Sequence, residues 1–179
     1  MPVLSSGEIE LVGLPIEIGF QPNLHIRRRK LREGPPGLQV HAASFIRERR
    51  IVLDSALRRK KAELQRIYFH ELYHFAWVRL GNPRRQDYES LLRAEARRRV
   101  PGELGWSAES RKQLLRPSDW RERTVRWREY VCESFCDTGA WLHCQRDCKD
   151  CDEFTLGRVN REERRGWFTE NGLDQRISI

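Results

Sequence analysis

The chain has 179 residues, of which 34 are Lys or Arg and 26 are Asp or Glu, and its formal net charge is +8. This length predicts one domain with a sizeable core, and no apolar run approaches the ~18 residues that a membrane-spanning helix needs. The N-terminus lacks the basic start and apolar stretch of a signal peptide. Five cysteines, an odd number clustered late in the chain, fit a reducing compartment better than a disulfide scaffold. We therefore expect a cytoplasmic protein that makes no membrane contact.

The basic charge comes mainly from arginine, with 29 Arg against 5 Lys. Runs at residues 27–30, 58–61 and 97–99 are the places where a nucleic acid or an acidic substrate could bind. No DNA-binding motif accompanies them. An excess of Arg over Lys also arises from a GC-rich genome, and we favour that explanation over direct nucleic-acid binding.

The N-terminal third predicts strands. Residues 16–20 alternate apolar and polar side chains, and residues 38–46 and Arg50–Asp54 are two further strand candidates, with residues 47–49 as their turn. Gly34-Pro35-Pro36-Gly37 interrupts the chain before them. A sheet leading into a helix is therefore expected.

Residues 57–80 predict that helix, and they contain His70-Glu71-Leu72-Tyr73-His74. Two histidines four residues apart project from the same side of a helix and can bind one metal ion, and the glutamate between them can hold a water molecule on it. Basic residues at the start oppose the helix dipole, so the true start is expected nearer Lys61. Gly81-Asn82-Pro83 ends the helix.

Residues 82–118 predict a charged helical insertion, which we interpret as a solvated spacer rather than as a wall of a cleft. A further helix is expected over residues 119–143, with Ser118 or Asp119 as its N-cap. In it Glu133 and Asp137 share one face between apolar residues, where buried charge is costly unless it is paired.

A metal ion would compensate that charge. Glu133 is then the third ligand, and Asp137 accepts the outer ring N–H of a ligand histidine. The alternative is an exposed carboxylate pair bound by Arg126 or Arg128. Glu122 and Glu129 lie on other faces of the helix and are weaker rivals as ligands.

His-Glu-x-x-His followed by Glu-x-x-x-Asp on a later helix resembles the gluzincin branch of the zincin metallopeptidases. The resemblance spans about residues 51–141. It implies that His70, His74 and Glu133 bind zinc, that Glu71 is the general base and that Asp137 orients the first histidine. The 59 positions between His74 and Glu133 exceed the tightest gluzincin spacing, which an inserted helical segment would explain.

The resemblance also implies a fold and a mode of substrate binding. It is an α+β fold in which a small, mostly antiparallel N-terminal sheet packs on the active-site helix, followed by a helical C-terminal half. An edge strand of that sheet would pair with an extended peptide substrate. The expected single domain, 1–179, divides into a sheet-rich part (1–56), the active-site helix (57–81), the insertion (82–118), the third-ligand helix (119–143) and a Cys-containing loop with the C-terminal tail (144–179).

The cysteines near the end of the chain provide a second candidate metal site. His143, Cys144, Cys148 and Cys151 could form a structural zinc site, although a polar loop with incidental thiols is the interpretation we favour. Cys132 and Cys136 flank Glu133. Cys136 could face the metal, but such cysteines are more often small buried apolar residues.

The function that these features predict is zinc-dependent hydrolysis of a peptide or protein substrate. Zinc would lower the pKa of water toward 7 and Glu71 would take its proton. Tyr73, Tyr130 and His143 are candidates for stabilising the oxyanion. Two alternatives remain open: a zincin fold that binds metal without cleaving, and a basic nucleic-acid-associated protein.

Overall fold

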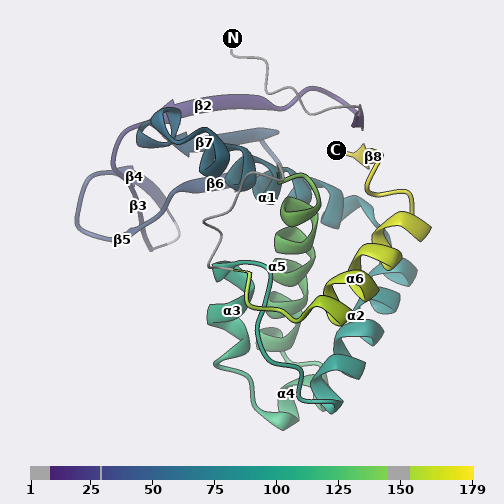
Figure 1. Cartoon of the computed structure of the whole chain (residues 1–179). Coiled ribbons are helices and arrows are strands. Elements are labelled where there is room, and N and C mark those ends of the chain that lie inside the picture. The colour runs from purple at the N-terminus through teal and green to yellow at the C-terminus, as the bar shows by residue number, and fades with distance from the viewer. Residues whose placement is uncertain (1–8, 29, 145–153) are drawn as a thin grey trace.

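The computed structural model describes residues 9–28, 30–144 and 154–179, which form a mixed α+β fold with small sheets and a helical C-terminal half (Figure 1). The strands are β1 (Glu10–Val12), β2 (Glu17–Gln21), β3 (Leu24–Arg27), β4 (Lys30–Glu33), β5 (Leu38–Gln39), β6 (Ala42–Phe45), β7 (Arg50–Asp54) and β8 (Arg176–Ser178). The helices are α1 (Lys61–Arg79), α2 (Asn82–Arg97), α3 (Trp106–Lys112), α4 (Pro117–Glu122), α5 (Val125–Leu142) and α6 (Arg158–Glu170), with a 3-10 turn, η1, at Ser55–Arg59.

The strands form three small sheets in the described part of the chain, instead of the one sheet expected. β2 pairs in parallel with β7, and β6 pairs antiparallel with β7, so β7 is central and β6 lies at an edge. β7 is central because Ile51, Val52 and Leu53 are all buried and fill both faces of the sheet. β3, β4 and β5 form an antiparallel sheet, and β1 pairs in parallel with β8. The strand expected over residues 38–46 is therefore two strands in different sheets.

α1 begins at Lys61, as the basic residues at the start of the predicted range indicated, and not at residue 57. Before it, Asp54 accepts a hydrogen bond from the backbone N–H of Ala56 at 2.9 Å and caps η1. This local bond gives residues 55–59 a tighter turn than an α-helix. α1 buries apolar side chains around most of its circumference, because β6 and β7 contact it on one side and α5 on another.

The insertion is part of the core and not a solvated spacer. Tyr88 and Leu92 of α2 and Ala108 of α3 are buried, and α3 packs on α5. Gly105, just before α3, approaches the Asp137 carboxyl group so closely that a Cβ there would lie 2.3 Å from its carbon. Glycine is required at this position by space rather than by backbone conformation.

The helix expected over residues 119–143 is two helices. Arg123 adopts a left-handed conformation, with φ 55°, and ends α4. Thr124 then caps α5, its side chain accepting from the backbone N–H of Trp127, so neither Ser118 nor Asp119 caps the ligand-bearing helix. α5 crosses α1 at close range, since a Cβ on Gly139 would lie 2.4 Å from the ring of Tyr73.

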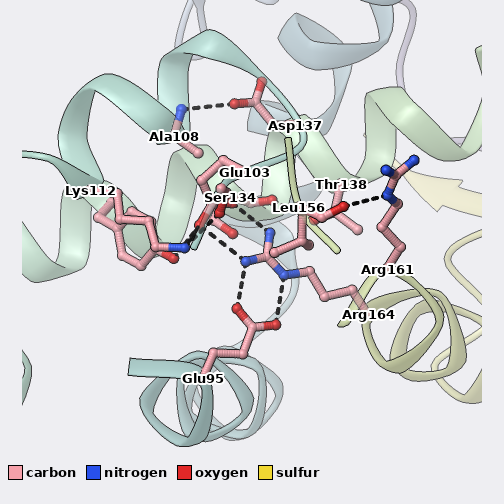
Figure 2. Close-up of polar contacts among 12 residues, drawn as sticks. Glu95, Glu103, Ala108, Lys112, Ser134, Asp137, Thr138, Leu156, Arg161 and Arg164 are labelled. Carbon is pink, nitrogen blue, oxygen red and sulfur yellow. Dashed lines mark hydrogen bonds and ion pairs between the residues drawn. The ribbon is translucent and has the colours of Figure 1, made fainter. Parts of the chain in front are cut away.

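A buried ion network fastens α6 to the insertion (Figure 2). Arg164 has no exposed side-chain surface, and it donates to Glu95 at 2.6 Å and to Glu103 at 2.7 Å. Burial raises the pKa of Glu103, but the Arg164 charge and hydrogen bonds outweigh it and lower that pKa to about 2. Beyond α6, Ile177 of β8 is buried against the core, so the C-terminal tail packs on the body.

Candidate metal centre

His70 and His74 lie one turn apart on α1, with ring centroids separated by 5.0 Å and ring planes at 82°. Their side chains are largely buried, with 12% and 21% exposed surface. Both project toward α5, which is the helix that packs most extensively on α1. Two imidazoles are thus held on one face of a rigid element.

Glu133 of α5 faces both rings. Its Oε2 atom lies 3.3 Å from Nε2 of His70 and 3.9 Å from Nε2 of His74. Ligands at about 2.0–2.1 Å around a tetrahedral zinc ion stand about 3.4 Å apart. The Glu133–His70 separation matches this value, and the Glu133–His74 separation is about 0.5 Å longer. All three donor atoms lie within 4.8 Å of one another, and they form one of two such groups among the described residues.

Asp137 fixes the orientation of His70. Its Oδ1 lies 2.7 Å from Nδ1 of His70. Its Oδ2 accepts from the backbone N–H of Ala108 at 2.8 Å (Figure 2). Burial lowers the pKa of His70, but the Asp137 charge and hydrogen bond, with help from Glu133, raise it well above its usual value. With the Nδ1 proton held by Asp137, the lone pair of a neutral ring lies on Nε2, which is the atom that faces Glu133.

Arg111 of α3 is a site residue that the sequence did not reveal. It contacts Oε1 of Glu133 at 3.0 Å, on the carboxylate oxygen other than the one facing the histidines. Burial raises the pKa of Glu133, but the two histidines and then Arg111 lower it to about 2. Glu133 is therefore paired with the insertion, and not with Arg126 or Arg128.

Glu71 lies beside the edge strand β6. The hydroxyl of Ser44 donates to the Glu71 carboxylate and also contacts the Glu71 backbone oxygen at 3.1 Å. Glu71 is 9% exposed, so its carboxylate is held at the junction of α1 and the sheet. Ser44 is the second site residue that sequence patterns did not indicate, because it contacts α1 across 27 positions of chain.

Two thiols face the other nitrogen of His74. Sγ of Cys136 lies 3.4 Å and Sγ of Cys132 lies 3.7 Å from its Nδ1. A hydrogen bond from Cys136 and the nearby His74 lower the pKa of Cys132 to about 6 against the opposing effect of burial. Burial raises the pKa of Cys136 well above its usual value. Cys136 is buried as expected, but its sulfur is in polar contact.

The three candidates for oxyanion stabilisation form their hydrogen bonds with groups outside the metal site. Tyr73 is fully buried, and its hydroxyl donates to the backbone oxygen of Leu173 at 2.7 Å and contacts Nε2 of His143 at 2.8 Å. Tyr130 donates to Glu103 at 2.5 Å inside the Arg164 network. Tyr73 and Tyr130 are buried, and His143 is partly buried.

The late cysteine cluster is described only in part. His143 stacks on Tyr73, and burial lowers its pKa to about 4. Cys144 is half-buried just after α5. Cys148 and Cys151 lie outside the described residues. The rival ligands Glu122 and Glu129 are exposed and remain outside the metal groups found in the described chain.

Comparisons with protein-family models, with curated protein sequences and with solved structures found no match. The site's function must therefore be inferred from its own geometry. Among the described residues, no helix is both long and apolar enough to span a bilayer.

Proposed function

We propose that this chain is a zinc-dependent peptidase of the gluzincin type. One observation carries the proposal: donor atoms of His70, His74 and Glu133, from two helices far apart in sequence, lie at ligand spacings, while Asp137 holds the outer nitrogen of His70. Two imidazoles and one carboxylate are the protein ligands of a catalytic zinc site that keeps one position open. Bound there, zinc would polarise the substrate carbonyl and acidify water.

Glu71 is the base in this proposal. Its carboxylate would accept a proton from the attacking water and return it to the leaving amine. Ser44 donates to the same carboxylate and so restricts its rotation. That contact orients Glu71 for proton transfer, and makes Ser44 a positioning residue.

The position of β6 favours an extended peptide as substrate. β6 pairs only with β7 in its sheet, so its other edge has no strand partner in the described chain. A peptide added along that edge by backbone hydrogen bonds would pass close to Glu71, because Ser44 belongs to β6. This placement supports peptide hydrolysis over hydrolysis of a compact small molecule.

The test compares wild-type protein with Glu71→Gln on an unstructured peptide library read by mass spectrometry, with bound zinc measured by elemental analysis. We expect Glu71→Gln to keep zinc and to lose about 10²–10⁴-fold in cleavage rate. Glu63→Gln is the matched control, since it removes an acidic group two turns earlier on α1, where its ion pair is with Lys60.

Full cleavage by zinc-loaded Glu71→Gln would refute the mechanism. Zinc binding with no cleavage by the wild-type chain would support a silent metal-binding module instead. Failure of the wild-type chain to bind zinc would refute the site itself.

A further inference from the structure

The thiols of Cys132 and Cys136 form, with Nδ1 of His74, a cluster that peptide hydrolysis does not use. We propose that these three groups are a second binding site, for one thiophilic metal ion softer than Zn²⁺, such as Cd²⁺ or Cu⁺. Thiolates select such ions over Mg²⁺ or Ca²⁺. This thiol site shares His74 with the proposed zinc site, but it does not depend on peptidase activity.

The spacing of the donor atoms fits one ion. With Zn–S near 2.3 Å and Zn–N near 2.0–2.1 Å, a tetrahedral ion separates sulfur from nitrogen by about 3.5 Å. The two sulfurs lie 3.4 and 3.7 Å from Nδ1 of His74, and all three atoms lie within 4.8 Å of one another. Two cysteines that served only as apolar filling would not both need to point at one ring nitrogen.

The secondary structure preorganises this cluster. Cys132 and Cys136 are four residues apart on α5, so both thiols project from one face, and α1 presents His74 opposite them. Cys136 is fully buried, whereas Cys132 is partly exposed and gives an ion a route from solvent. Binding would release the thiol protons and leave the fourth position to water.

The two sites use opposite nitrogens of His74: Nε2 faces Glu133 and Nδ1 faces the thiols. A neutral imidazole has one nitrogen lone pair, because the other nitrogen carries the proton. An ion at the thiol site therefore leaves an N–H directed at the first site and removes His74 from it. We infer that the two sites compete for His74 and that a thiophilic ion displaces zinc.

The test uses the triple variant Cys144→Ser, Cys148→Ser, Cys151→Ser as background. Of the chain's five cysteines, only Cys132 and Cys136 remain in this variant. The metal-free protein is titrated with Cd²⁺ and followed by the ultraviolet sulfur-to-cadmium charge-transfer band, with bound cadmium counted by elemental analysis. We expect a band that saturates at one Cd²⁺ per chain. Adding His70→Ala and Glu133→Gln should leave the band unchanged, whereas Cys132→Ser with Cys136→Ala should abolish it.

Absence of the band in the triple variant, or its loss with His70→Ala and Glu133→Gln, would overturn the proposal. Circular dichroism checks folding, and where Cys136→Ala fails to fold, Cys132→Ser alone should halve the band. Competition is tested by loading the triple variant with zinc and adding Cd²⁺, which should release zinc to a chromogenic chelator. Release of no zinc, with the band fully formed, would overturn competition.

Zinc binding by the same variants tests the proposed zinc site separately. The variant without Cys132 and Cys136 keeps His70, His74 and Glu133, and should still bind one zinc ion. If it binds none while the cadmium band forms normally in the triple variant, the first site fails and the thiol site stands.

Discussion

Replacing Asp137 with asparagine should damage the metal centre through one lost acceptor. Asp137 accepts from two donors, the Nδ1–H of His70 at 2.7 Å and the backbone N–H of Ala108 at 2.8 Å. An asparagine side chain of the same shape offers one oxygen and one NH₂ group, so one of the two donors then faces another donor. Asp137 is 2% exposed, and solvent cannot replace the missing partner.

The cost depends on which donor loses its partner. A buried donor left unsatisfied costs about 1–3 kcal/mol of stability. If the asparagine NH₂ faces His70, the ring is driven to the tautomer with its proton on Nε2, the atom needed for metal binding. Loss of such an outer partner typically weakens metal binding by about 10–100-fold. We therefore expect a weaker metal site together with a less stable fold.

The assay is a zinc titration against a competing chelator, paired with urea unfolding of the metal-free protein. Glu129→Gln is the matched control, because it neutralises an exposed carboxylate two turns before Asp137 on the same helix. Unchanged zinc affinity and unchanged unfolding free energy in Asp137→Asn would show that Asp137 neither orients His70 nor supports α3.

Two further predictions concern charge. The raised pKa of His70 means that the His70 ring holds its proton more tightly in the folded state than in the unfolded state. The stability that this proton contributes to the metal-free protein should be fully present below about pH 6.5 and should be lost as the pH rises through the folded-state pKa. The loss should be at most about 1.4 kcal/mol per pH unit. Urea unfolding between pH 6 and 9 measures this, and His70→Gln should flatten the slope; an equal slope in both proteins would contradict the assignment. Arg164→Met should lower the unfolding free energy at pH 7 by about 3–5 kcal/mol, because it removes the cation that pairs with buried Glu95 and leaves buried Glu103 with Lys112 alone. A loss under about 1 kcal/mol would show that the network contributes little.

Local sequence patterns predicted the elements that depend on local interactions. β7 follows from a run of β-branched and apolar residues, and the end of α1 from Gly81 and Pro83. The break between α4 and α5 was missed because arginine gives no sign of a left-handed backbone at residue 123. Thr124 did carry a usable signal, since threonine directly before a helical run is a good N-cap.

Contacts between side chains that are far apart in the sequence could not be predicted from the sequence. The His-Glu-x-x-His pattern and the paired carboxylates nominated the residues that the structure brings together on α1 and α5. Ser44 and Arg111 were not nominated, because nothing local marks a serine in a strand or an arginine among 29 as a site residue. The insertion was misread as a spacer since its charged composition hides Tyr88 and Leu92, which are buried.

The insertion changes how the motif should be understood. Each acidic residue of the site is held by an element other than its own: Ser44 of β6 bonds Glu71, Arg111 of α3 pairs with Glu133, and the backbone of Ala108 bonds Asp137. Two of these three partners come from one short helix between the ligand helices. The long spacing between His74 and Glu133 is therefore functional in this proposal, because α3 orients the third ligand and the outer partner of the first. A shorter connection would keep all three ligands but leave the carboxylates of Glu133 and Asp137 without the groups that hold them in place.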